Sequence, residues 1–282
     1  MANSIRRLLL VAAIVLLTAP GPVRGAECPG DVNGDNTVNV LDLIDLLLCF
    51  GQPATPPGDT ADIVADGTVN VLDLIELLLN FGVPCLFDYG PPLANPEAEQ
   101  IALEMLGAGG PLLVLPEQYE RIDRDLGRIR QFEPALAAEI DSPAWLPNHL
   151  IVKVLIGPPL DEYQCLNTYY QVIDENFLFS SGGGDWYVLT FAGNLNAAAL
   201  GGIYAALPEI EFADPDALIG GQNFWVPTEQ GGGVWRWNVD DGFHDCFDGC
   251  DCHRLYVFET DAAGNVVLIS FQEQGAPWCV FD

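Results

Sequence analysis

The sequence predicts a multi-domain chain, in which a small all-α module precedes an α+β sandwich and an antiparallel β tail. Three observations favour this division. A loop and an apolar helix occur twice in succession, alternating and helical patterns follow one another further on, and short β-type segments with Gly-rich turns complete the chain. The expected units are residues 26–86, 97–141, 146–220 and 221–282, with a proline-rich linker over 87–96.

The N-terminus, residues 1–25, has the pattern of a signal peptide. Arg6 and Arg7 precede the run LLLVAAIVLLTA, which is short for a bilayer span, and Val23 and Gly25 stand before the expected cleavage at Ala26. A retained anchor is the alternative, but APGP and VRGAE break the apolar run early. We therefore expect a secreted protein, extracellular or at the cell surface, with no membrane insertion after cleavage.

Acidic residues dominate the charge. The chain has 40 Asp and Glu against 10 Lys and Arg, a net charge of −30, and cleavage would leave seven basic residues and a charge of −33. Such a charge argues against nucleic acid as a partner, whereas cations are expected to associate with the protein. The eight cysteines of an exported chain favour disulfides over metal ligands.

The repeat becomes clear at an offset of 31 residues. DVNGDNTVNVLDLIDLLLCFG begins at Asp31, and DIVADGTVNVLDLIELLLNFG begins at Asp62. In the first copy, side-chain oxygens stand at loop positions one, three, five, nine and twelve, and a backbone carbonyl is expected at position seven. This is the ligand order of an EF-hand calcium loop, whose hard oxygen donors converge on the ion.

Each loop leads into a predicted helix, VLDLIDLLL in the first copy and VLDLIELLL in the second. Apolar residues cover most of the helix circumference, so we expect both helices to be buried, with Asp42 and Asp45 on one side of the first. The helix dipole favours the carboxylate of Asp42. Gly51 and Gly82 are expected to end the helices as C-caps.

Over about residues 29–85 the repeat resembles a type I dockerin, a half EF-hand pair with two calcium loops, each followed by a helix. The resemblance implies calcium-dependent folding into an antiparallel helix pair and docking onto a cohesin-like partner. It also implies that Cys28 and Cys85 are neighbours and form a disulfide, leaving Cys49 to pair elsewhere. Carried over by position, the Ca²⁺ ligands would be Asp31, Asn33, Asp35, Thr37, Asn39 and Asp42, and Asp62, Asp66, Thr68, Asn70 and Asp73.

Two departures limit the resemblance. Val64 occupies the third position of the second loop, so that loop lacks one ligand. The positions with which dockerins choose their cohesins hold apolar residues, so the partner's identity does not carry over; they are Val40, Leu41, Val71 and Leu72. The near-identical copies would still offer two equivalent ways to dock. The alternative is a calcium-stapled helical hairpin that serves stability alone.

Two helices are predicted beyond the linker, PEAEQIALEML and PEQYERIDRDLGRIRQF, each beginning with Pro and Glu. The second concentrates four arginines, Arg121, Arg124, Arg128 and Arg130. We expect these to pair internally, with partners such as Glu120 and Asp125. An anion or partner site is the alternative.

Residues 146–220 predict a small α+β sandwich of the ferredoxin-like type. Strands are expected at 150–156, 185–193 and 210–220, and helices at 161–173 and 194–207. The stretches PNHLIVKV and LPEIEFADPD resemble the propeptide and inhibitor domains of subtilisin-type proteases, which share that fold. Because no subtilisin signature follows and too few residues remain for a catalytic domain, we favour reuse of the fold over a stand-alone inhibitor.

The tail is expected to form a meander of strands, with TDAAGN as one of its turns. His244, Cys246, Cys250, Cys252 and His253 could hold zinc. A Cys246–Cys250 bridge is preferred, with Cys165 and Cys279 also available for pairing. Trp225, Trp235 and Trp237 are expected in the core, with a sugar-stacking platform as the alternative.

No activated nucleophile is evident, and no catalytic residue is assigned. We therefore predict a secreted, non-catalytic calcium-binding protein that mediates attachment or assembly. The alternatives are a component of a polysaccharide-degrading enzyme, because dockerins usually accompany such catalytic domains, and a protease inhibitor built on residues 146–220.

Overall fold

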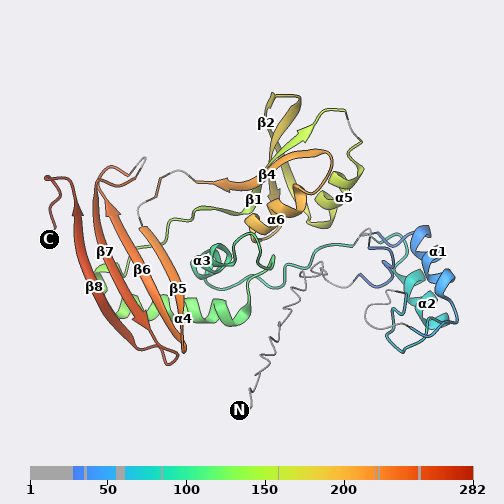
Figure 1. Cartoon of the computed structure of the whole chain (residues 1–282), viewed down its shortest axis with the longest axis horizontal. Coiled ribbons are helices and arrows are strands. Elements are labelled where there is room, and N and C mark those ends of the chain that lie inside the picture. Colours follow the sequence, from blue (N-terminus) through green and yellow to red (C-terminus); the bar gives the residue numbers. More distant parts are fainter. Residues whose placement is uncertain are drawn as a thin grey trace, which may run out of the picture.

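The computed structural model describes residues 28–34, 37–54, 61–83, 85–157, 159–218, 220–221, 223–246 and 249–281. These residues form a mixed α/β structure with two antiparallel four-stranded sheets and six α-helices (Figure 1). None of the helices they contain has the length and apolar character needed to cross a membrane. The expected signal peptide lies outside the described residues.

The expectation of a small all-α module set apart from the rest of the chain is wrong. The two repeats contain α1 (Val40–Cys49) and α2 (Val71–Leu79), but their buried residues belong to the same hydrophobic core as the first sheet. Phe87 continues this core from the repeats to Tyr169 and Tyr170, whose rings it contacts. Periodicity in a sequence identifies a helix, but it does not show which core the helix joins.

The first sheet has the strand order β2-β3-β1-β4, and all neighbouring strands are antiparallel. Two helices connect the strands in the β-α-β-β-α-β order of a ferredoxin-like unit. The elements are β1 (Trp145–Leu155), α5 (Asp161–Tyr169), β2 (Val172–Ser181), β3 (Gly184–Phe191), α6 (Ala197–Tyr204) and β4 (Ile210–Ala217). Alternate residues of β1, namely Leu150, Val152 and Val154, are buried in the core.

Strand β2 is absent from the sequence-based prediction, which extended the preceding helix to residue 173. Helix α5 ends at Tyr169, and Gln171 has a φ of 50°, a left-handed conformation that turns the chain before β2. The strand lies at the edge of the sheet, and nearly all of its residues are exposed. With no buried face, it shows no alternation of apolar and polar residues.

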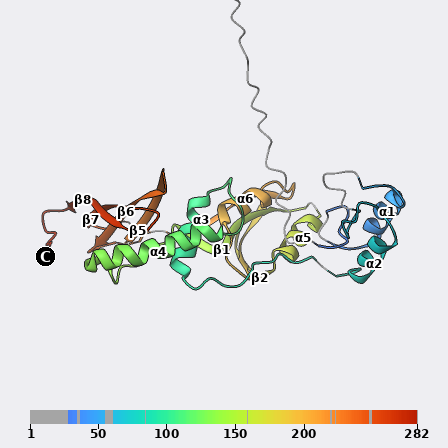
Figure 2. The same cartoon turned by 90° about the horizontal axis from the view of Figure 1, so that it is seen from below.

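The predicted meander is confirmed as the second sheet, whose strands follow one another in sequence order. They are β5 (Asn223–Gly231), β6 (Val234–Phe243), β7 (Cys252–Thr260) and β8 (Val266–Gly275). Helices α3 (Pro96–Leu106) and α4 (Pro116–Phe132) have the predicted bounds, and their buried apolar residues share a core with those of this sheet. Figure 2 shows α4 running beside the strands of the sheet. Trp225, Trp235 and Trp237 are buried in that core, so the sugar-platform alternative is wrong.

Arginines of α4 pair internally, as predicted, although Asp125 rather than Glu120 is the main partner. The buried carboxylate of Asp125 accepts hydrogen bonds from Arg121 at 2.7 Å and from Arg124 at 2.8 Å. The hydroxyl of Thr260 on β7 donates to the same carboxylate. This network therefore ties α4 to the end of strand β7.

Disulfides join Cys28 to Cys85 and Cys246 to Cys250, as predicted, and a third joins Cys252 to Cys279. Because these bonds consume the thiolates of the tail cluster, the zinc alternative is wrong. The Nδ1 atom of His253 instead lies 2.7 Å from a carboxylate oxygen of Asp240. Cys49 and Cys165 form no disulfide.

Candidate calcium loops and the apolar helix faces

A fully buried carboxylate stands in the first turn of each repeat helix. Asp42 accepts hydrogen bonds from the backbone N–H groups of Val32 at 2.8 Å, Asn33 at 3.1 Å and Asn39 at 2.8 Å. Asp73 does the same in the second repeat, with Val64 at 2.9 Å and Asn70 at 2.7 Å. Position twelve therefore holds each loop over the start of its own helix.

The asparagine at position nine caps each helix. The Oδ1 atom of Asn39 accepts from the N–H of Leu41 at 2.7 Å, and its Nδ2 atom donates to the carbonyl of Thr37 at 3.0 Å. Asn70 repeats both bonds, with Leu72 and with the carbonyl of Thr68, each at 2.8 Å. Together with the buried aspartates these residues form two capping boxes.

The remaining expected ligands of the second loop are linked by hydrogen bonds. Asp62 accepts from the N–H groups of Asp66 at 3.1 Å and Gly67 at 3.0 Å. Asp66 in turn accepts from Nδ2 of Asn70 at 2.9 Å. The structure thus brings Asp62, Asp66, Thr68 and Asn70 into one turn of chain.

In the first loop, Asp31 accepts from the N–H of Gly34 at 2.8 Å. Its carboxylate lies within 4.8 Å of the sulfurs of Cys28 and Cys85. Because those sulfurs are bonded to each other, Asp31 alone of the three can bind a cation. Asp35 lies outside the described residues.

Val64 supplies no side-chain oxygen to the second loop, although its backbone contributes to the turn. The next residue, Ala65, has a φ of 55°, and the equivalent Gly34 has a φ of 78°. Both loops therefore use the same left-handed turn, which costs an alanine about 1–2 kcal/mol and a glycine almost nothing. The second loop is thus poorer in ligands and more strained than the first.

The two repeats hold each other through matched backbone hydrogen bonds. The N–H of Gly51 donates to the carbonyl of Val69 at 2.7 Å, and the N–H of Gly82 donates to that of Val38 at 2.8 Å. Both glycines follow a helix and have a φ of 77°, which suits glycine. The sequence predicted their place at the helix ends but not their bonds to the opposite loop.

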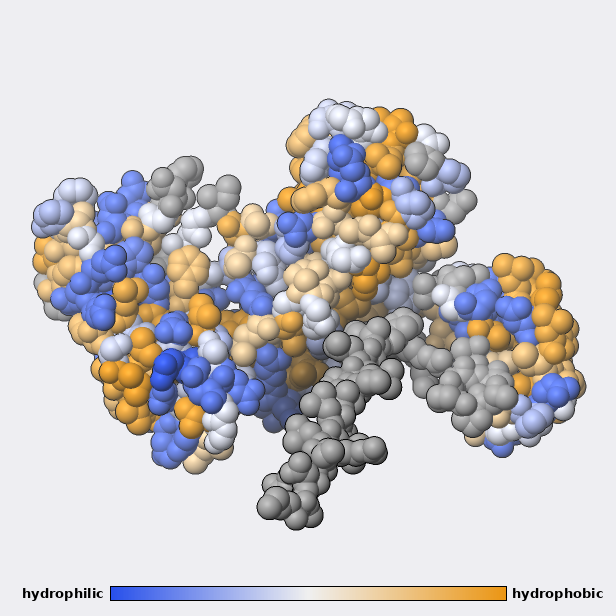
Figure 3. Space-filling view, viewed as in Figure 1, coloured by the Kyte–Doolittle hydropathy of each residue, from blue (hydrophilic) through white to orange (hydrophobic). Residues whose placement is uncertain are grey.

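The predicted burial of the two repeat helices is wrong. In α1 only Asp42 and Leu46 are buried, and in α2 only Asp73 and Leu77. Leu43, Cys49 and Leu74 are partly buried against the core. The remaining apolar side chains form two matching exposed faces, visible as orange atoms over α1 and α2 in Figure 3. Leu41 and Leu72 are 53% and 50% exposed, Ile44 and Ile75 are 49% and 48% exposed, and Leu48 and Leu79 are 77% and 72% exposed.

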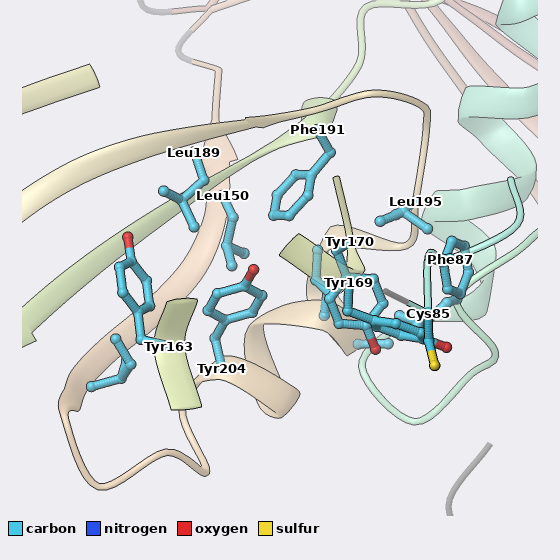
Figure 4. Packing of buried hydrophobic residues seen from close by; sticks show 14 of the residues in the cluster. Cys85, Phe87, Leu150, Tyr163, Tyr169, Tyr170, Leu189, Phe191, Leu195 and Tyr204 are labelled. Carbon is cyan, nitrogen blue, oxygen red and sulfur yellow. The ribbon is translucent and has the colours of Figure 1, made fainter. Parts of the chain in front are cut away.

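The first residues of the expected linker are anchored to the first sheet's unit (Figure 4). The N–H of Phe87 donates to the carbonyl of Tyr169 at 2.8 Å, and the hydroxyl of Tyr89 donates to that of Tyr170 at 2.6 Å. Burial and the nearby charge of Asp31 both raise the pKa of Tyr169. The loop of the first repeat therefore lies close to the end of α5.

No protein-family model matches the chain, and searches of curated proteins and of solved structures returned no significant match.

Proposed function

We propose that this chain is a secreted, non-catalytic attachment protein that binds Ca²⁺ in its paired loops and a protein partner on the exposed faces of α1 and α2. In this it would act in the manner of the dockerins that its repeat resembles. The bound partner would be an extracellular protein, cohesin-like or with another apolar docking surface. Disulfides in the described residues support an oxidising compartment outside the cytoplasm.

The matched exposure of the two helices is the observation that carries the proposal. Soluble proteins rarely expose a contiguous apolar surface of this kind unless it contacts something. Here the same side chains are exposed twice, at equivalent positions and to nearly equal degrees. The repeat therefore presents the same apolar side chains to solvent from both helices, which gives a partner two equivalent surfaces to bind.

Calcium would bind inside the loops, to the oxygen atoms of their own residues. Carboxylates, amides and backbone carbonyls are the oxygen donors that Ca²⁺ takes, six to eight at a time. The carboxylates of Asp31 and Asp62 accept hydrogen bonds from backbone N–H groups, and an ion in the loop would compete for the same oxygens. Since the ion binds the folded loops, it stabilises the helices that carry the apolar faces.

Calcium binding is tested by calorimetric titration of the chain from Ala26 onward with Ca²⁺. We expect heat of binding in the wild type and a clear loss of affinity in Asp31→Ala. Glu229→Gln, which removes one exposed charge from strand β5, is the matched control and is expected to bind as the wild type does. No binding at millimolar calcium would contradict the proposal.

Partner binding is tested by capture from the secreted fraction of the same cells, with and without chelator. The double variant Leu48→Asp/Leu79→Asp is expected to lose a partner that the wild type retains only with calcium. Ile156→Asp alters an apolar residue outside the repeats that is also largely exposed, at 65%, and it is expected to keep the partner. Equal capture by both variants would rule out docking through the helix faces.

A further inference from the structure

A second group of oxygen donors lies outside the repeats, where residues 139–145 pass along the start of strand β5. Asn223 is the first residue of β5, and its register partner on β6 is Asp241. Both residues are 5% exposed. In antiparallel strands such directly opposite residues have their side chains on the same face of the sheet.

The amide of Asn223 is only half satisfied. Its Nδ2 atom donates to the carboxylate of Glu139 at 2.7 Å, whereas its Oδ1 atom is buried and has no hydrogen-bond partner. A buried oxygen without a partner is unfavourable, because it has lost its contact with water and gained no hydrogen bond in return. The side chain of Asn223 thus lies beside the carboxylates of Glu139 and Asp241 with a free acceptor.

The charges around this amide are also poorly balanced. The carboxylates of Glu139 and Asp241 both lie beside Asn223, and Asp241 is buried. Arg254 offers the nearest described cation, at 3.4 Å from the Asp241 carboxylate, which is a long contact for an ion pair. A second positive charge at this position would relieve the repulsion between the two carboxylates.

We propose that Glu139, Asn223 and Asp241 form a divalent cation site, best suited to Ca²⁺. Two carboxylates and an amide oxygen are hard donors of the kind that calcium takes, and water would complete the coordination. The ion would give Asn223 Oδ1 the partner it lacks. This site is independent of the two loops and of their proposed function.

The position of the site suggests what the ion would do. The segment that carries Glu139 is already attached to β5, because Ser142 donates to the carbonyl of Asn223 at 2.6 Å and Asp141 accepts from the N–H of Trp225 at 2.7 Å. The same segment leads from the helix pair into β1 of the first sheet. A bound cation would therefore stabilise the connection between the two sheets.

The test uses terbium as the probe, on the chain from Ala26 onward. No tryptophan occurs before Trp145, so the loops have none of their own, whereas Trp225 is two residues from Asn223. Tryptophan-selective excitation should therefore report an ion bound at this site. We expect sensitised terbium emission that calcium competes away and that persists in the double loop variant Asp31→Ala/Asp62→Ala.

Variants of the site decide the assignment. Asp241→Asn and Glu139→Gln are each expected to weaken terbium binding by about tenfold or more, the change that 1.4 kcal/mol produces. Glu229→Gln, on the same strand, is the matched control and should bind as the wild type does. Asn223→Asp adds a carboxylate, so it is expected to tighten binding and to make thermal stability depend on calcium. Emission unchanged in Asp241→Asn and Glu139→Gln, or absent from the wild type, would overturn the proposal.

Discussion

The N–H of Gly51 donates to the carbonyl of Val69 at 2.7 Å, so the end of the first repeat's helix is held by the second repeat's loop. An equivalent bond joins Gly82 to Val38. Each loop is therefore supported by the helix end of the other repeat. An ion that orders one loop therefore also orders a segment that supports the other loop. We expect the calcium affinities of the two loops to be coupled for this reason.

Asp31→Ala is expected to reduce calcium-dependent stability more than Asp62→Ala. The first loop has an oxygen donor at position three, Asn33, where the second has Val64. At a free calcium concentration a hundred times the dissociation constant, binding adds about 2.7 kcal/mol, and most of this should be lost in Asp31→Ala. Thermal unfolding followed by helical circular dichroism, with and without chelator, measures the difference. Equal losses in the two variants would show that the loops bind calcium equally.

Val64→Asp is expected to raise the calcium affinity of the second loop, because it restores a donor at the third position. The side chain is 45% exposed, so the new carboxylate does not disturb a core. The gain should be about tenfold or more, and calorimetric titration measures it. Val267→Asp on β8 adds the same charge at an exposed position and should leave affinity unchanged. A second loop that still binds no ion in Val64→Asp would contradict this prediction.

Asp125→Ala is expected to destabilise the second sheet and its helices by about 3–5 kcal/mol. The change leaves Arg121, Arg124 and Thr260 without their shared acceptor, and breaking a buried pair on one side is costly. Glu120→Ala on the same helix removes an exposed carboxylate and should cost no more than about 0.5 kcal/mol. Denaturation followed by tryptophan fluorescence compares the two. Similar midpoints would show that the network adds little.

Asp141 is expected to make the second sheet less stable as the pH rises. Burial is the main cause that raises the pKa of Asp141 from 3.8 to about 7. The negative charges of Glu104 and Glu97 also raise this pKa, whereas the hydrogen bond from the N–H of Trp225 lowers it. The folded chain therefore holds a proton that the unfolded chain has lost, so stability falls between these two pH values. Asp141→Asn should flatten this dependence and add on the order of 2 kcal/mol above pH 7.

The measurement is the denaturation midpoint, followed by tryptophan fluorescence across this pH range. Asp174→Asn, an exposed change on β2, is the control and should leave the slope unchanged. A slope as steep in Asp141→Asn as in the wild type would assign the pH dependence to other groups.

Elements with a strong local signal could be predicted from the sequence. Helices α3 and α4 begin at Pro96 and Pro116, where proline followed by glutamate predicts a start, and the meander is evident from its alternating strands and turns. Strand β2 could not be predicted, because an edge strand exposed on both faces carries no period-two pattern. The expected all-α module failed for a different reason: packing against the first sheet depends on contacts distant in sequence.

The candidate sites show the same limit. The order of oxygen donors identified the loops, and the hydrogen bonds of Asp42 and Asp73 follow from their place in the first helical turn. The apolar circumference of the two repeat helices predicts that they are buried. Leu48 and Leu79 are nevertheless exposed, so this prediction is wrong. Asn223 and Asp241 are 18 residues apart in sequence and offer no motif, so only their opposition across two strands reveals them.

The bond between Cys28 and Cys85 closes the two repeats into a covalent ring of chain. Tension between a docked partner and the body of the protein would leave this ring at Cys85 and pass directly into the contact of Phe87 with Tyr169. Because the disulfide links the two ends of the repeat segment, tension would extend the repeats no further than the ring allows. If the repeats bind a partner as proposed, the contact of Phe87 with Tyr169 would be the first non-covalent contact beyond the ring to carry that tension.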